Sequence, residues 1–234
     1  MSQFVTNELY HIYNRGVEKR NIFLDDKDRV RFIHDLYEFN DKNPTLNLNY
    51  HVGSQTEYTG VSLQYIQAKP RETIVEILVF CLMDNHFHLL LRQKVENGIT
   101  MFMHKLGTGY TNSFNKRYER AGSLFQGKFK AVNIQSEEQL MYLPYYIHLN
   151  PIELAYPGWK ENGLRDYKKV TEFLSNYRWS SHLDYAGNKN FPSLTEREFL
   201  LKIFGGQSSY KKGLENQIRE YTEEVLGGIA FNEK

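Results

Sequence analysis

Two histidines separated by one residue are the first feature of the chain that could do chemistry. His86 and His88 stand in MDNHFHLLLRQ, residues 83–93, at the head of an apolar run. Side chains alternate across a β-strand, so both imidazoles would project from one face, roughly 7 Å apart along the strand, while Phe87 faces the other side. Neutral imidazole is a common ligand of divalent metals. The spacing therefore fits a metal site, although polar residues on the exposed face of a half-buried strand would give the same letters.

A third metal ligand would have to come from elsewhere, and the segment ending YYIHLNP supplies candidates. Tyr146 and Asn150 are four residues apart and so share one face of a helix. An amide oxygen suits a hard cation such as Mg²⁺ or Mn²⁺. Tyr142 lies on the same face one turn earlier, whereas His148 points elsewhere. Judged alone, Tyr146 is equally well explained as an aromatic residue that packs the helix.

The elements that must position these residues can be predicted from hydrophobic periodicity. Strand-like patterns occupy residues 10–16, 73–82, 86–92 and 122–135, and helical patterns occupy 25–40, 99–114 and 136–150. Two further helices are expected, one capped by Thr195 and ended by Gly205 and one from about Ser208. The order strand, helix, strand, strand, helix, strand, helix predicts an α+β fold, a ferredoxin-like antiparallel sheet with helices on one face and the other face open.

Length and composition set the domain organisation. The chain has 234 residues, of which 41% are apolar and 15% aromatic, so it can bury a sizeable core. We expect a main domain over 1–155, with 41–72 as an inserted hairpin, and a helical C-terminal extension over 156–234. The single Cys81 excludes an internal disulfide and a cysteine-based metal cage. No apolar segment is long enough to span a membrane and no secretory signal is visible, which predicts a cytoplasmic protein.

Charge is unevenly distributed although the formal net charge is only +1. A locally basic segment with aromatic residues between the charges can bind a phosphate backbone, but a solvated helix face has the same composition. The basic segment runs from residue 105 to 130 and holds Lys105, Lys116, Arg117, Arg120, Lys128 and Lys130 against only Glu119.

The motifs resemble those of a known family. MDNHFHLLL resembles the His-hydrophobic-His signature of the single-tyrosine HUH transposases, and YIHLNP resembles their tyrosine helix as it occurs in the REP-associated tyrosine transposases. The likeness covers residues 10–40 and 73 to about 187, with 41–72 departing as an insertion. Three more segments follow in the family's order: YNRGVEKRNIFLDDKDRVRFI, LGTGYTNSFNKRYERAGSLFQGKFKAV and YRWSSHLDYAG.

The resemblance implies an HUH endonuclease/transposase fold and a metal-dependent DNA transposase. Tyr146 would attack a phosphodiester of single-stranded DNA to give a 5′-phosphotyrosine, with Mg²⁺ or Mn²⁺ held by His86, His88 and Asn150. A phenol with a pKa of about 10 is a weak nucleophile, so a nearby cation or base must assist it. Gln126 is the alternative third ligand.

The implied partner is single-stranded DNA, including strands that form hairpins, bound by a monomer or a homodimer. Tyr110 or Phe125 would stack on bases. Two other functions fit the same sequence: a domesticated or replication-initiator-like HUH nickase, and a non-catalytic module that binds single-stranded nucleic acid. The candidate DNA-binding residues are Arg15, Arg117, Arg120, Gln126, Lys128 and Lys130.

Overall fold

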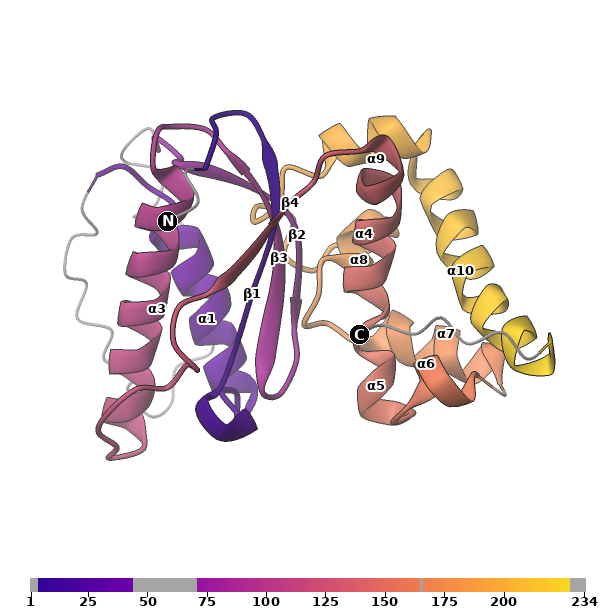
Figure 1. Ribbon diagram of the computed structural model, residues 1–234, viewed down its shortest axis with the longest axis horizontal. Helices are drawn as coiled ribbons and strands as arrows, with labels where there is room; N and C mark the ends of the chain where they lie inside the picture. Colours follow the sequence, from indigo (N-terminus) through magenta and orange to yellow (C-terminus); the bar gives the residue numbers. More distant parts are fainter. Residues whose placement is uncertain (1–3, 44–70, 165, 228–234) are drawn as a thin grey trace.

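A four-stranded antiparallel sheet forms the centre of the computed structural model, which describes residues 4–43, 71–164 and 166–227 (Figure 1). The strand order is β2-β3-β1-β4. One helix, α1, follows β1, and another, α3, lies between β3 and β4. This is the order of a ferredoxin-like split βαβ, so the predicted fold class is confirmed. The elements are β1 (Leu9–Arg15), α1 (Asp26–Glu38), β2 (Val75–Leu82), β3 (His86–Gln93), α3 (Gly98–Arg117) and β4 (Lys130–Asn133).

One face of the sheet packs on α1 and α3, as Figure 1 shows to the left of the strands. The β3 residues Phe87, Leu89 and Leu91 belong to this core, in which Phe32 of α1 and Phe102 of α3 are fully buried. Their alternation with His86, His88 and Leu90 is the one predicted from the sequence. The apolar stripe of α3 thus serves as core, and the histidines are left for the opposite face.

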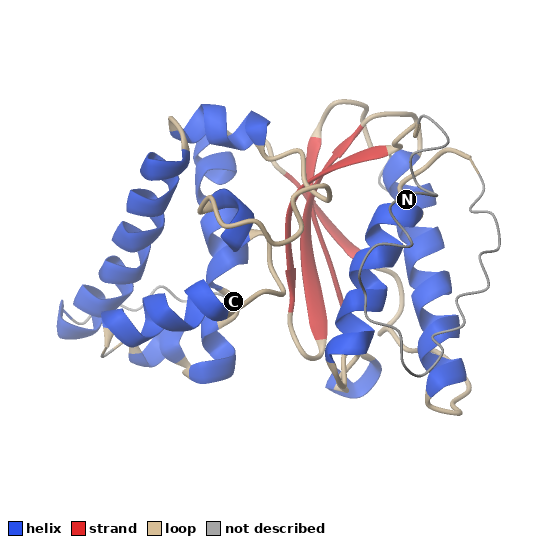
Figure 2. Ribbon diagram, turned by 180° about the vertical axis from the view of Figure 1, so that it is seen from behind, coloured by secondary structure: helices blue, strands red, loops and turns tan. Residues whose placement is uncertain are grey.

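The opposite face is covered, so the expectation of an open face is wrong. Helix α4 (Glu137–Leu149) packs on β2 and β3, and the helices that follow it complete a third layer, seen from behind in Figure 2. Leu78, Val79 and Leu90 of the sheet share a core with Ile147 and Leu149 of α4. The sequence of the edge strand β2 does carry a sign of this covering, because β2 is apolar on both faces, which is typical of a strand that is buried on both sides.

The helical C-terminal region shares that second core through Trp159, Tyr185 and Tyr210. Among the described residues, no helix is long and apolar enough to cross a membrane. The helices are α5 (Ile152–Ala155), α6 (Trp159–Asn162), α7 (Tyr167–Asn176), α8 (His182–Tyr185), α9 (Glu198–Phe204) and α10 (Gln207–Gly227), and a short 3₁₀ turn, η1 (Val17–Lys19), follows β1.

Several predicted boundaries need correction. The strand expected over 122–135 is continuous only as β4. Residues 122–129 form bends around the buried Leu124 and Phe125, and there Phe125 makes an isolated bridge with Gly16. Thr195 does not cap α9: the N-cap is Arg197, and the Thr195 hydroxyl is buried without a partner. Ser136 does cap α4 by accepting a hydrogen bond from the backbone N–H of Gln139. Most of the hairpin expected over 41–72 lies outside the described residues.

Candidate active site

The histidine pair lies on β3 where the register with β1 brings a second strand beside it. Tyr13 stands opposite His88, and Arg15 stands opposite His86. The rings of His86 and His88 have centroids 5.0 Å apart and lie nearly perpendicular to each other. A third imidazole, His11 of β1, stacks on His88 at 5.1 Å. The antiparallel register therefore gathers three imidazoles on the face of the sheet that α4 covers.

Helix α4 places Tyr146 directly over this group. The Tyr146 ring centroid lies 6.0 Å from that of His88 and 6.2 Å from that of His11, both in edge-to-face geometry. Successive helical residues are about 100° apart around the axis, so its two neighbouring tyrosines face other surroundings. Tyr145 is buried against Tyr210, and Tyr142 is 44% exposed. Of the three tyrosines, Tyr146 is the one beside the histidines.

Each histidine of the pair makes a hydrogen bond through Nδ1. His86 Nδ1 is 2.6 Å from Asn85 Oδ1, and the Asn85 amide is oriented by donating from Nδ2 to the carbonyl of Lys19. An amide oxygen can only accept, so His86 carries its proton on Nδ1. His88 Nδ1 is 2.9 Å from His11 Nε2. Metal-binding histidines commonly use one ring nitrogen for such an orienting partner and the other for the metal.

The environment keeps these imidazoles uncharged. Burial, followed by the positive charge of Arg15, lowers the pKa of His86 to about 4. Burial lowers the pKa of His11 to about 4, and it lowers that of His88 well below the usual value, with His86 and His11 adding to the effect. Since the neutral form of histidine is the one that binds metals, the pair is in the ligating state at neutral pH.

Asn150, expected as the third ligand, is buried at the end of α4 and donates from Nδ2 to the backbone carbonyl of Tyr146. This bond turns its amide nitrogen toward its own helix and leaves Oδ1, the atom that a cation would prefer, to point away from that carbonyl. Among the described residues, no cluster of three or more His, Cys, Asp or Glu side chains could hold a metal ion. A metal at the pair would therefore need an amide, water or substrate oxygen as a further ligand.

A cation that could not be predicted from the sequence lies beside Tyr146. Lys160 of α6 has its ammonium nitrogen 4.3 Å from the centroid of the Tyr146 ring. Its positive charge also lowers the pKa of both His86 and His88. Because α6 belongs to the C-terminal region, only the tertiary packing brings this lysine to the residues of the HUH motif.

Other predicted DNA contacts lie at the end of β1 and on the segment that leads into the edge strand β4. Arg15 and Gln126 are exposed and hydrogen-bonded to each other at 2.5 Å. Lys128 and Lys130 are exposed, and Lys130 stands opposite Tyr13 in the pairing of β4 with β1. Paired residues of antiparallel strands share a face, so Lys130 lies on the face that holds His88.

Four other candidates are engaged in the fold. Arg117 forms ion pairs with Asp25 and Asp28, which tie α3 to the start of α1. Arg120 donates to Asn115 Oδ1 at 2.6 Å. The suggestion that Tyr110 or Phe125 stacks on bases is wrong, because both are buried in the core under α3: they are 1% and 7% exposed, and the Tyr110 hydroxyl donates to the backbone of Ile22.

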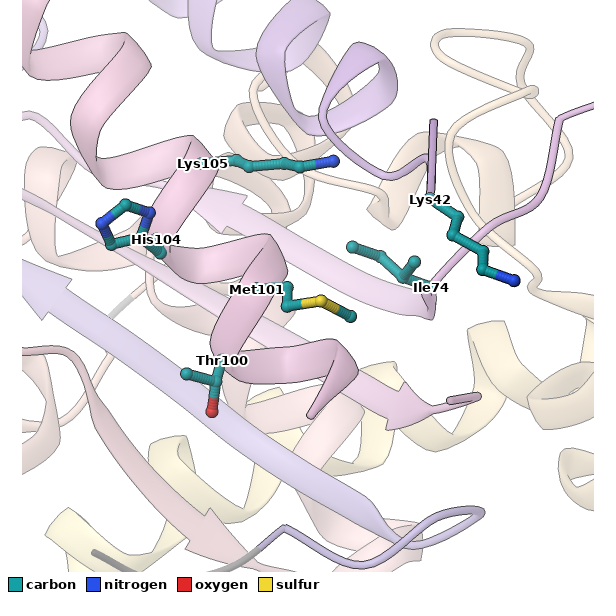
Figure 3. A pocket seen from close by; sticks show the side chains of 6 residues that line it. All are labelled: Lys42, Ile74, Thr100, Met101, His104 and Lys105. Carbon is teal, nitrogen blue, oxygen red and sulfur yellow. The ribbon is translucent and has the colours of Figure 1, made fainter. Parts of the chain in front are cut away.

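A shallow hollow on the surface does not mark this site. Its lining includes Thr100, Met101, His104 and Lys105 of α3, as Figure 3 shows. These residues belong to the helix on the opposite side of the sheet from the histidine pair, as Figure 1 shows. The candidate site is instead the junction of β1, β3 and α4.

A ferredoxin-like sheet whose His-X-His pair faces a helix-borne tyrosine is the arrangement that the resemblance to HUH transposases implies. Residues 49–150 match the sequence model of a family described as "Transposase IS200 like". This segment contains His86, His88, Tyr146 and Asn150. The resemblance is thereby confirmed over this segment, which is similar to IS200-like transposases.

No curated protein matches the chain. A solved structure titled "Structure of the REP associates tyrosine transposase bound to a REP hairpin" is similar, with 11% sequence identity and a TM-score of 0.48, and the alignment covers 82% of this chain and 89% of that one.

Proposed function

We propose that this protein cleaves and rejoins single-stranded DNA through a 5′-phosphotyrosine intermediate on Tyr146. The observation that carries the proposal is the position of the Tyr146 ring, 6.0 Å from His88 on the face of the sheet that displays the histidine pair. The match to a transposase family supports the reaction class. Both strand cleavage and strand transfer follow from one reversible step.

In the forward step the Tyr146 phenol oxygen attacks the phosphorus of a phosphodiester. The bond from phosphorus to the 3′ oxygen breaks, the phenol proton is released, and the 3′ oxygen leaves as a hydroxyl after taking up a proton. The 5′ phosphate remains esterified to Tyr146. In the reverse step a 3′-hydroxyl attacks the phosphotyrosine, restores a phosphodiester and frees the phenol. Since the ester bond energy is retained, the transfer requires no nucleotide cofactor.

His86, His88 and Asn150 are the proposed ligands of Mg²⁺ or Mn²⁺. The residues fit such an ion because both imidazoles are neutral and both use Nδ1 for hydrogen bonds within the protein. When bound, the cation would neutralise charge on the scissile phosphate. The Asn150 amide oxygen would supply the hard ligand that two imidazoles lack.

Cationic side chains near the site would bind the DNA strand. Lys160 lies over the Tyr146 ring, where its charge favours the phenolate that develops during attack and the entering phosphate. The exposed residues Arg15, Gln126, Lys128 and Lys130 would hold the DNA backbone. We do not propose Arg117 and Arg120 as DNA contacts, because both side chains already bond to other residues of the protein.

The site is composed of residues from one chain, so a monomer can complete it. A labelled single strand that includes a hairpin is the first substrate to test, because the similar solved structure was determined with one. Incubation with Mn²⁺ should give a covalent protein–DNA adduct that survives denaturation, and Tyr146→Phe should give none while still binding DNA.

Tyr142→Phe is the matched control, since this exposed tyrosine lies one turn away on the same helix and should leave the adduct unchanged. Strand binding without any adduct would contradict the proposal and favour a non-catalytic single-strand-binding module. Cleavage without strand transfer would favour the HUH nickase.

A further inference from the structure

His11 is the one imidazole of the group that the sequence motif does not contain. It lies on β1 opposite Leu90, is half-buried, and stacks on His88 with an angle of 19° between the ring planes. Its Nε2 is 2.9 Å from His88 Nδ1. The contact depends on the β1–β3 register and not on sequence proximity, because the two residues are 77 positions apart.

One hydrogen bond between two neutral imidazoles admits two arrangements. Either His88 Nδ1–H donates to His11 Nε2, which leaves a lone pair on His88 Nε2, or His11 Nε2–H donates to His88 Nδ1, which places the His88 proton on Nε2. Only the first arrangement lets His88 bind a metal through Nε2. The identity of the donor therefore decides whether His88 is a ligand.

The neighbouring histidine indicates the direction. His86 donates from Nδ1 to the Asn85 oxygen, so its lone pair is on Nε2. The two rings of the motif thus use the same nitrogen toward the protein, and an ion that both rings share would meet Nε2 on each. His11 then has the same relation to His88 that Asn85 has to His86.

We propose that His11 is a positioning residue: its Nε2 accepts the Nδ1 proton of His88 and so presents the lone pair of His88 Nε2 to the metal shared with His86. This inference rests on the proposed function and specifies how one of its ligands is oriented. His11 also contacts the Tyr146 ring edge to face, with centroids 6.2 Å apart, so it lies against both the ligand and the nucleophile.

The test begins with the metal-free protein. Long-range ¹H–¹⁵N correlation spectra of ¹⁵N-histidine-labelled protein report which nitrogen of each ring carries the proton. We expect His88 to be protonated at Nδ1 and bare at Nε2. A proton on His88 Nε2 in the unsubstituted protein would overturn the proposal, and this measurement needs no variant.

Two variants at position 11 separate hydrogen bonding from packing. His11→Gln keeps an acceptor oxygen near the position of Nε2, whereas His11→Leu keeps apolar bulk without an acceptor. In His11→Leu, Mn²⁺ affinity measured by calorimetry should fall by about 10- to 100-fold, the usual effect of losing an orienting partner, and His88 should shift toward the Nε2-protonated form. His11→Gln should restore both.

His104→Leu is the matched control, because His104 is an exposed histidine on α3 and should change neither measurement. Equal loss in His11→Leu and His11→Gln would show that only packing matters and would contradict the proposal. Failure of the two ideas is distinguishable: correct tautomers and Mn²⁺ binding without an adduct would refute the proposed function alone, whereas a normal adduct with unchanged tautomers in His11→Leu would refute this inference alone.

Discussion

Two groups of histidines lie on the α4 side of the sheet, and they use their nitrogens differently. The sheet histidines are His11, His86 and His88, and the core histidines are His148 and His182. Helix α4 contributes to both, since it places Tyr146 over the first group and carries His148 into the second. Burial lowers the pKa of all five.

The core histidines are tied into the protein. His148 bonds Ser181 Oγ through Nε2 at 2.7 Å and the Tyr210 hydroxyl through Nδ1 at 2.7 Å. Tyr210 also bonds His182 Nδ1, and Ser181 accepts from the backbone of Phe80 on β2. His148 has no nitrogen left for a ligand, so this group fastens α4 and α10 to the sheet. For His86 and His88, by contrast, we propose metal binding.

The largest expected effect separates the two groups by activity. His88→Ala should lower the rate of adduct formation roughly 10³-fold, since losing a ligand removes several kcal/mol of charge stabilisation at about 1.4 kcal/mol per tenfold. Strand binding should persist because backbone contacts supply most affinity. Single-turnover cleavage with Mn²⁺ measures the loss, and undiminished cleavage in excess chelator would contradict the metal assignment.

The reverse pattern is expected for the core histidines. His148→Leu leaves the Ser181 and Tyr210 hydroxyls short of a buried partner, at about 1–3 kcal/mol for each group left unsatisfied. Urea unfolding should show this loss of stability, while the folded fraction should retain adduct formation within a few-fold. A folded His148→Leu protein that is as inactive as His88→Ala would contradict the assignment of His148 to the stability of the fold alone.

Stabilisation by Mn²⁺ should also distinguish the sheet histidines from the core histidines. A ligand that binds only the folded state raises stability in proportion to the logarithm of its concentration above Kd. Mn²⁺ should therefore raise the melting temperature of the unsubstituted protein and of His148→Leu, but not that of His86→Ala. An equal rise in all three proteins would place the ion elsewhere.

A fall in pH should lower the stability of the protein through both the sheet histidines and the core histidines. The pKa values of His11, His86 and His182 are lowered to about 4 in the folded protein, so between about pH 6.5 and 4 the unfolded chain binds more protons than the folded one. The free energy of unfolding should fall as the pH drops through this window. Urea unfolding between pH 7 and 4 measures the fall, and its slope should be smaller in His148→Leu. A flat profile would contradict the neutral, buried state of these rings.

The smallest effect concerns the DNA contacts. Lys128→Ala combined with Lys130→Ala should weaken strand binding and reduce the slope of log affinity against log salt by about 1.4, the value for two phosphate contacts to a single strand. Arg117→Ala should instead lower stability, because it removes two ion pairs between α3 and α1. A salt slope that is unchanged by the lysine substitutions would show that Lys128 and Lys130 do not contact the DNA backbone.

The sequence predicted what strand alternation and helical spacing determine: the order of strands and helices along the chain, the common face of His86 and His88, and the separation of Tyr146 from Tyr145. It did not reveal His11, Asn85 or Lys160, since the first depends on strand register, the second on a turn hydrogen bond and the third on a helix in the C-terminal region. It suggested base stacking by Tyr110 because composition alone does not distinguish an exposed aromatic residue from a buried one.

The most direct test of the central claim is to locate the covalent bond. After incubation with a single strand and Mn²⁺, digestion and mass spectrometry should find the nucleotide on the peptide that contains Tyr146. Substitution to Phe at position 146, but not at 142 or 145, should abolish it, since of these three tyrosines of α4 it is Tyr146 whose ring lies beside His88. A nucleotide on Tyr142 or Tyr145, or an adduct that persists in Tyr146→Phe, would contradict the account.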